Sequence, residues 1–375
     1  MNVFRLFFKY KIKLMKSLKI GNLTVKVPII QGGMGVGISL SGLSSAVANE
    51  GGIGVISSAG LGLLYMQSCK DYIKSSIEGL KQELHKAREK SPKGVIGVNI
   101  MVALTNFSDM AKTAIKEKAD IIFSGAGLPL NLPSFLDKDS TTKLAPIVSS
   151  ARALKVIVEK WKRNFNYIPD LVVVEGPKAG GHLGYKLNQI EDTEHFSLEH
   201  ILIDVLKQVR YYEAEFNVKI PVIVGGGIYT GEDMAKIMEL GADGVQLGTR
   251  FVTTEECDAS DAFKDEYLKA KKEDIVIIKS PVGMPGRAIN NKFLEEVSLG
   301  LHTPKVCPFN CIKTCQMEKS PYCIIMSLYN AYKGKMTQGY AFSGTNAWRA
   351  TKIETVKGVF DSLKKGYESY VNREK

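Results

Sequence analysis

Short apolar runs rich in valine and isoleucine recur along the chain, and helix-like segments lie between them. Eight such runs are present, at residues 27–30, 53–56, 95–98, 120–123, 145–148, 171–174, 221–224 and 244–247. A strand that is apolar on both faces is typical of a parallel sheet covered by helices. The alternation predicts an α/β fold, and eight strands favour a (β/α)8 TIM barrel over an open sheet.

Nearly every run ends in small or polar residues, which therefore stand at the carboxyl ends of the predicted strands. They are Gln31-Gly32-Gly33, Ser57-Ser58-Ala59, Asn99, Ser124-Gly125-Ala126-Gly127, Ser149-Ser150, Glu175-Gly176, Gly225-Gly226-Gly227 and Gly248-Thr249. Barrel enzymes build their active sites at this end of the sheet. The sequence therefore predicts a ligand site there.

A different type of sequence follows the eighth run. Residues 275–287 predict a strand that leads into a loop, and the chain from Asn290 onward predicts mostly helix. We divide the chain into an N-terminal extension (1–20), a barrel (21–290) and a mainly helical C-terminal extension (291–375) that packs on the barrel. Because residues 1–14 are basic and aromatic and ordinary domain sequence begins at Met15, we hypothesise that translation starts at Met15.

Composition restricts the class of protein. Of 375 residues, 45% are hydrophobic and 24% charged, which is typical of a globular chain. The net charge is +11, but the lysines are spread along predicted helix faces, which favours a solvated surface over nucleic-acid binding. We find no apolar stretch of the roughly 20 residues that cross a bilayer, and no leader peptide. Six cysteines are too few for a disulfide framework, so we expect reduced thiols and a cytoplasmic protein.

Two neighbouring loops predict a phosphate site. Gly225-Gly226-Gly227 joins the seventh strand to a predicted helix, and Gly248-Thr249 follows the eighth strand. Glycines allow close backbone approach, and a helix N-terminus offers free N–H groups to an anion. Barrels commonly bind phosphate after strands seven and eight. Neither a G-x-G-x-x-G motif after the first strand nor a G-K-[ST] loop is present, so a Rossmann domain and a nucleotide hydrolase are disfavoured.

The octapeptide Glu175-Gly176-Pro177-Lys178-Ala179-Gly180-Gly181-His182 places an imidazole close after the sixth strand, next to two glycines. A histidine there is able to contact a ligand that lies on those glycines. We therefore take His182 as the candidate catalytic residue.

These motifs, taken together and in this order, resemble the nitronate monooxygenase family, formerly called 2-nitropropane dioxygenases, whose relatives include flavin-dependent enoyl-acyl-carrier-protein reductases. The matching segments are Pro28-Ile29-Ile30-Gln31-Gly32-Gly33-Met34, Gly97-Val98-Asn99, Gly125-Ala126-Gly127, Ala179-Gly180-Gly181-His182, Gly225-Gly226-Gly227-Ile228 and Leu247-Gly248-Thr249-Arg250-Phe251.

The resemblance implies an FMN-containing TIM barrel. The residues that it suggests as FMN contacts are Gln31, Gly33, Met34, Asn99, Gly125, Ser149, Ala179, Gly180, Gly181, Gly225, Gly226, Gly227, Gly248 and Thr249. By this analogy the last glycine loops hold the phosphate and His182 faces the substrate above the flavin ring. The resemblance implies no metal ion in the core family.

The implied reaction is the oxidation of an alkyl nitronate, or its parent nitroalkane, by O2 to a carbonyl compound and nitrite. His182 would act as general base or, as imidazolium, would bind the nitro oxygens. An alternative is an enoyl thioester reductase that uses NADH and FMN and docks an acyl carrier protein, and a third interpretation is a flavin-binding protein without turnover. The physiological substrate and the oligomeric state, with a homodimer as one option, stay open.

Four cysteines gather in the C-terminal extension as C-x3-C-x3-C-x7-C: Cys307, Cys311, Cys315 and Cys323. If this segment is helical, the first three share a face, and four thiolates are able to hold zinc or an iron–sulfur cluster. The spacing matches no common ribbon or ferredoxin motif, so ordinary thiols are the favoured interpretation. His85 is expected at the surface. His195 and His200 flank residues 196–199 after the sixth strand, where a substrate role is the less favoured alternative. Residues 342–349 have the makeup of a turn near a ligand or of a cap on a terminal helix.

Overall fold

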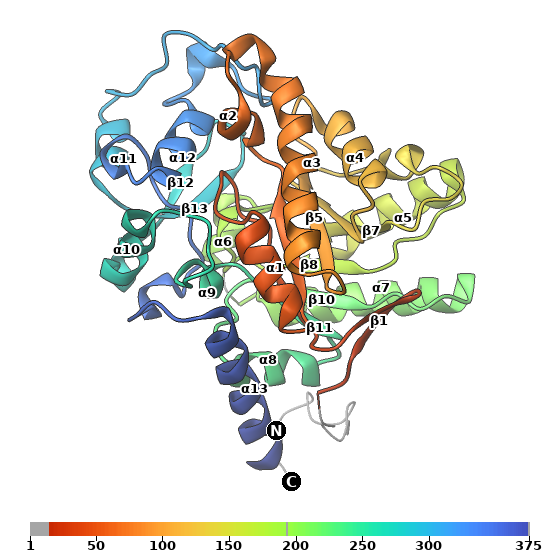
Figure 1. Cartoon of the computed structure of the whole chain (residues 1–375). Helices are drawn as coiled ribbons and strands as arrows, with labels where there is room; N and C mark the ends of the chain where they lie inside the picture. Colours follow the sequence, from red (N-terminus) through yellow and green to blue (C-terminus); the bar gives the residue numbers. More distant parts are fainter. Residues whose placement is uncertain (1–14, 193, 374–375) are drawn as a thin grey trace.

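Eight parallel strands close a barrel in the computed structural model, which describes residues 15–192 and 194–373 (Figure 1). The strands are β3 (Ile29–Gln31), β4 (Ile53–Ser57), β5 (Val95–Met101), β6 (Ile121–Gly125), β7 (Lys143–Val148), β8 (Val172–Glu175), β10 (Val222–Gly225) and β11 (Gly244–Leu247). They neighbour one another in sequence order, and β11 pairs with β3 to complete the ring. The predicted (β/α)8 barrel is confirmed, and every predicted run contributes one strand.

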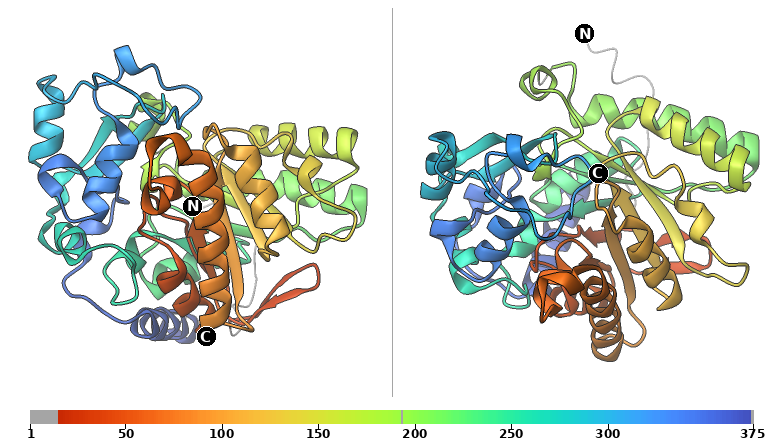
Figure 2. Two further views of the ribbon diagram at one scale, coloured as in Figure 1. Left: turned by 45° about the horizontal axis from the view of Figure 1, so that its top comes forward. Right: turned by 90° about the horizontal axis from the view of Figure 1, so that it is seen from above.

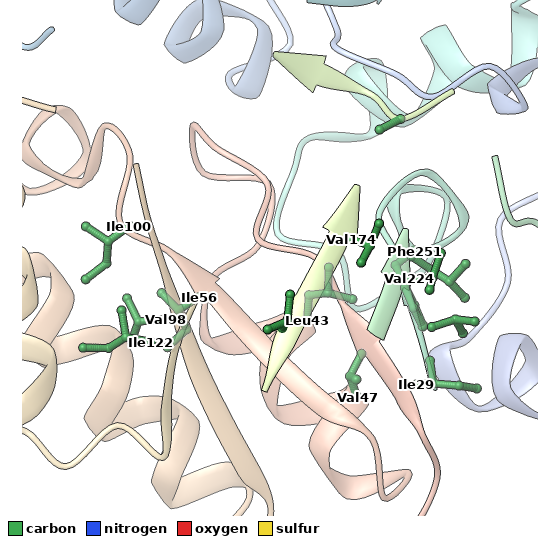
Figure 3. Close-up of a cluster of buried hydrophobic side chains, with 14 of the residues drawn as sticks. Ile29, Leu43, Val47, Ile56, Val98, Ile100, Ile122, Val174, Val224 and Phe251 are labelled. Atoms are coloured by element: carbon green, nitrogen blue, oxygen red, sulfur yellow. The ribbon is translucent and has the colours of Figure 1, made fainter. Parts of the chain in front are cut away.

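Helices surround the barrel, as the two further views in Figure 2 show. They include α1 (Ser41–Asn49), α3 (Tyr72–Lys90), α4 (Phe107–Lys116), α5 (Ala151–Phe165), α7 (Leu198–Phe216), α8 (Gly231–Glu239) and the short α9 (Thr249–Val252). Alternate strand residues such as Val98, Val174 and Val224 face these helices and join Leu43 of α1 in one buried cluster (Figure 3). Their neighbours Val173 and Ile223 belong to a second cluster inside the barrel. Burial on both faces explains why the strands read as continuous apolar runs.

A hairpin packs against the interior of the barrel at its amino-terminal end. Strands β1 (Leu18–Ile20) and β2 (Leu23–Val25) pair antiparallel, and Leu18, Ile20 and Val25 join the inner cluster. The hairpin therefore spans the boundary at residue 20 suggested by the sequence. Residues 1–14 lie outside the described residues, and the hypothesis of a start at Met15 lies there too.

A small antiparallel sheet lies over the carboxyl ends of the barrel strands. Its central strand β13 (Pro285–Ile289) pairs with β12 (Ile275–Lys279) on one side and with β9 (Gly181–His182) on the other. The sequence predicted a strand followed by a loop here, whereas the structure forms a second strand after the turn. Shorter elements nearby are α2 (Leu61–Tyr65), α6 (Leu187–Glu191), α10 (Asp261–Lys269) and the 3-10 turns η2 (Cys69–Asp71), η3 (Leu132–Phe135) and η4 (Lys272–Asp274).

The C-terminal region is helical, as predicted, in α11 (Lys292–Ser298), α12 (Ile324–Tyr332) and α13 (Val356–Arg373). Helix α13 crosses α8 so closely that a Cβ on Gly231 would stand 2.0 Å from the Leu363 carbonyl oxygen. Short 3-10 turns η5 (Met317–Lys319), η6 (Met336–Gln338) and η7 (Ala347–Arg349) connect the helices. Within the described ranges, no helix is long and apolar enough to cross a membrane.

The cysteine segment differs from the helical expectation. Residues 305–316 form an irregular loop, held by a bridge between Leu104 and Ile312 rather than by helical hydrogen bonds. The idea that Cys307, Cys311 and Cys315 share a helix face is therefore wrong.

Candidate active site

A cavity opens at the carboxyl ends of the barrel strands, below the small sheet. It is lined by most of the residues that the sequence suggested as ligand contacts: Gly33, Met34, Asn99, Gly125, Ala179, Gly180, Gly181, His182, Gly225, Gly226, Gly227, Gly248 and Thr249. These residues come from segments far apart in the sequence, and the closed barrel brings them to one space because all its strands end there.

Two suggested contacts lie outside this lining. Gln31 is fully buried in the barrel wall, where its Oε1 accepts the Val55 N–H at 3.0 Å. Its amide thus links β3 to β4. Ser149 donates its hydroxyl to the Gly184 carbonyl at 3.0 Å and lines a separate pocket with His195 and His200. His85 lies on the surface and pairs with Glu117.

The loops after β10 and β11 form an anion-binding end of the cavity. Gly226 and Gly227 adopt positive φ angles of 107° and 86°, which favour glycine. Their N–H groups and that of Gly248 have no hydrogen-bond acceptor within the described part of the chain. Helix α8 starts shortly afterwards with a capping box between Thr230 and Asp233. Unpaired N–H groups at strand ends suit the oxygens of a phosphate.

The C-terminal region closes this end of the cavity. The Gly344 N–H donates to the Thr249 hydroxyl at 2.9 Å, and the Asn346 side-chain amide donates to the Gly227 carbonyl at 2.7 Å. Phe342, Ser343 and Gly344 line the cavity themselves. The segment that the sequence singled out at residues 342–349 therefore lies against both glycine loops.

His182 is fixed from three sides. Its backbone lies in β9, opposite Gly286 of β13. Its Nε2 lies 2.7 Å from the Ser280 Oγ, and its ring packs edge-on against Phe342 at 4.9 Å between centroids. Burial lowers the pKa of His182 to about 4. The ring is therefore neutral at pH 7, which favours a neutral donor or base over the imidazolium role.

Glu175 is a site residue that the sequence analysis did not select. It ends β8, lines the cavity, and its carboxylate makes no hydrogen bond or ion pair with any described residue. Burial raises its pKa to about 7. Its position at the end of an apolar strand is the sequence signal that it faces the site.

Ser343 is a second residue that the prediction missed. Its hydroxyl is buried, lines the cavity and has no hydrogen-bond partner within the part of the chain that the structure describes. A buried hydroxyl without a partner costs free energy unless a ligand or water pairs with it. No local pattern marks Ser343, because only the return of the C-terminal region to the barrel brings it here.

The four cysteines of the C-terminal region were candidates for a metal site. Among the described residues, no group of three or more His, Cys, Asp or Glu side chains is arranged to hold a metal ion. Burial, with further contributions from Cys323, Cys307 and Cys315, raises the pKa of the Cys311 thiol to about 12. Such a thiol is unreactive at neutral pH.

Comparisons with known proteins agree with this geometry. The family model for nitronate monooxygenase matches residues 16–366. A probable nitronate monooxygenase from Staphylococcus aureus strain JH9 is 29% identical over 300 residues, which cover 74% of this chain and 79% of that protein.

Two solved structures are similar over most of their lengths. FabK from Thermotoga maritima is 26% identical with a TM-score of 0.70, covering 92% of this chain and 94% of its own. A nitroalkane oxidase from Streptomyces ansochromogenes is 19% identical with a TM-score of 0.69, covering 93% and 97%, and supports the fold alone. The family match extends over nearly the whole chain, so this protein belongs to the nitronate monooxygenase family and is a flavin-dependent oxidoreductase.

Proposed function

We propose that the protein binds FMN and oxidises alkyl nitronates with O2 to carbonyl compounds and nitrite. The observation that carries this proposal is one cavity in which His182 faces the same space as the glycine loops after β10 and β11. The family match supports the reaction class.

The cavity fits FMN in two respects. Gly226, Gly227 and Gly248 offer unpaired N–H groups at one end, where a single terminal phosphate would bind. A Cβ added to Gly181 would meet no protein atom within 4 Å, so this glycine borders open space beside His182. The unpartnered Ser343 hydroxyl is available to a polar atom of the ligand.

The chain's own residues bind and orient, while the flavin supplies the electron-accepting chemistry. A nitronate is already deprotonated at carbon and needs no base. A neutral nitroalkane does need one, and burial makes the neutral His182 ring a weak base with a pKa of about 4. This favours the nitronate over the nitroalkane as substrate.

A second candidate is the reduction of an enoyl thioester by NADH, the activity of the related flavin-dependent reductases. Lys178 favours it: its stem packs over Gly227, the side chain lines the cavity, and its ammonium pairs with no described residue. A free ammonium at a cavity mouth suits the phosphates of a dinucleotide or of an acyl carrier.

The two candidates separate in one set of assays. The purified protein, with its flavin identified by mass after release, receives a nitronate with O2 and, separately, NADH with an enoyl thioester. Nitrite release in the first assay without substrate-dependent NADH oxidation in the second supports our proposal, and the reverse result overturns it. Bound flavin with neither activity supports a binding protein without turnover.

A further inference from the structure

Ser280 contacts the candidate catalytic residue directly. It follows β12 at the turn into β13 and is only 3% exposed. Its Oγ lies 2.7 Å from the Nε2 of His182, at a position far from His182 in the sequence. The small sheet thus does more than cover the barrel, because it delivers a hydroxyl to one ring nitrogen.

The direction of this hydrogen bond follows from the other partner of the hydroxyl. The Val282 N–H donates to the Ser280 Oγ at 3.3 Å, so that contact uses the oxygen as an acceptor. Within the described residues, the Ser280 proton has no acceptor other than the His182 Nε2. A buried hydroxyl donates its proton where an acceptor is in reach. The Nε2 atom of His182 therefore accepts.

Because Nε2 accepts a hydrogen bond, it carries no proton, and this determines the protonation of Nδ1. A neutral imidazole carries one proton, so His182 carries it on Nδ1. The Nδ1 atom has no hydrogen-bond partner within the described ranges, and the side chain lines the cavity, with Phe342 packed against the ring. The group that His182 offers to a ligand is thus an N–H donor.

We propose that Ser280 is the positioning residue that holds His182 in its Nδ1–H form, so that His182 donates a hydrogen bond to a substrate oxygen instead of removing a proton from carbon. This inference rests on the proposed nitronate reaction and deepens it. A substrate with an anionic oxygen next to the reacting carbon matches such a donor, and no proton changes place in the contact.

The first test reads the tautomer and does not depend on turnover. The flavin-loaded protein is labelled with 15N-histidine, and the His182 signals are assigned among five histidines by comparison with His182→Gln. We expect a protonated Nδ1 and an unprotonated Nε2. Ser280→Ala should shift His182 toward the other tautomer, and Ser280→Thr, which keeps the hydroxyl, should restore it. A protonated Nε2 in the unaltered protein overturns the proposal.

The second test measures the rate of catalysis. Ser280→Ala should lower kcat/KM for a nitronate about tenfold, the scale of one lost hydrogen bond, with flavin content unchanged and Ser280→Thr recovering most of the loss. Ser76→Ala removes another buried serine hydroxyl, which bonds the Tyr72 carbonyl, and should leave kcat/KM unaltered.

The two tests also separate this inference from the proposed function. If the protein releases no nitrite but the Nδ1–H form is found and depends on the Ser280 hydroxyl, the proposed reaction fails and the tautomer assignment stands. If nitrite is released at an undiminished rate by Ser280→Ala, the positioning role fails and the reaction stands. Should Ser280→Ala not fold, the tautomer in the unaltered protein and in Ser280→Thr still decides.

Discussion

Burial in one cavity shifts the pKa values of Glu175 and His182 in opposite directions. Burial disfavours charge, so it raises the pKa of the Glu175 carboxyl to about 7 and lowers that of the His182 imidazole to about 4. Between these values both groups are neutral in the folded protein. Under the proposed nitronate reaction, a neutral wall suits an anionic substrate beside a flavin.

The first prediction concerns Glu175→Gln and stability. The folded pKa of about 7 lies above the ordinary 4.5, so the stability linked to this group is full below pH 4.5 and is lost as pH rises through 7. The difference corresponds to about 3 kcal/mol. Between pH 5 and pH 8, urea unfolding of flavin-free protein should show the unaltered protein losing about 2–3 kcal/mol of stability relative to Glu175→Gln.

His182 also makes the stability depend on pH, but in the opposite direction. Its pKa is lowered in the folded protein, so its contribution to stability is lost as pH falls from 6.5 to about 4. Because His182 is present in both proteins, this contribution cancels when the two are compared. Glu368→Gln changes an exposed glutamate and should behave like the unaltered protein. Equal pH dependence in all three would show that Glu175 does not titrate as described.

Gly248→Ala should separate flavin binding from folding. The backbone φ of Gly248 is −106°, which alanine adopts freely, and a Cβ there would contact only the Met34 side chain, with Sδ at 3.4 Å and Cγ at 3.8 Å. The methyl group would instead occupy the cavity at its anion-binding end. We expect FMN affinity, measured by fluorescence quenching, to fall at least about tenfold, while thermal unfolding without flavin stays as in the control Gly358→Ala. Unchanged affinity would place the phosphate elsewhere.

Most residues that the sequence placed in the cavity lie at or shortly after the carboxyl ends of buried strands. The glycine loops follow β10 and β11 directly, His182 lies in β9 shortly after β8, and the barrel brings such positions together. Gln31 also ends a strand, but its side chain points within the barrel wall to the Val55 N–H. Ser343 enters the site only through tertiary packing, which no local pattern encodes.

At the scale of elements, helix α1 shows how a helix start depends on a distant residue. Its N-cap position is Leu40, which has no capping side chain. The Asp258 carboxylate accepts hydrogen bonds from the N–H groups of Leu40, Gly42 and Leu43 at 2.7, 3.0 and 3.1 Å. Asp258 lies 218 residues after Leu40 in the sequence. The sequence predicted the helix region but not this cap, because the partner is non-local.

Asp258→Ala should therefore destabilise the whole fold. Three N–H groups would lose their acceptor, and a negative charge would be removed from a helix N-terminus, for a cost of about 2–4 kcal/mol. Urea unfolding at neutral pH measures the difference. Asp265→Ala, which removes an exposed carboxylate from α10, is the matched control and should cost less than about 0.5 kcal/mol. A similarly small cost for Asp258→Ala would contradict the capping role.

Strands and loops of the C-terminal half were harder to predict than those of the barrel. The sequence of β13 contains glycine and proline and predicts a loop. The segment is nevertheless extended, because it pairs with both β12 and β9. The cysteine segment lacks a helix because Ile312 pairs with Leu104 of the barrel side instead. In both cases tertiary pairing overrides local preference.

At the scale of the whole molecule, the C-terminal region returns to the barrel at several separate points. Besides the contacts at Thr249 and Gly227, Arg250 pairs with Glu354, and the Glu354 N–H donates to the Thr253 carbonyl at 3.0 Å. Helix α13 then packs on α8. Contacts so widely distributed couple the stability of the two parts.

We therefore expect a single cooperative unfolding transition. The two tryptophans report on different parts: Trp161 is fully buried in α5, and Trp348 is 39% exposed in the C-terminal region. In urea, the fluorescence of Trp348→Phe should report the barrel and that of Trp161→Phe the C-terminal region. Within each variant, the fluorescence midpoint should coincide with that from circular dichroism. Separate midpoints would reveal an independently unfolding part.

The closure of the anion-binding end by Gly344 and Asn346 has a consequence for how the protein matures. On the ribosome, the barrel strands are complete long before residue 344 is made. Until that segment emerges, the cavity lacks one wall, and flavin has no closed pocket to occupy. We therefore expect flavin capture to be a late event in biosynthesis, and we expect the same wall to slow the escape of flavin from the finished protein.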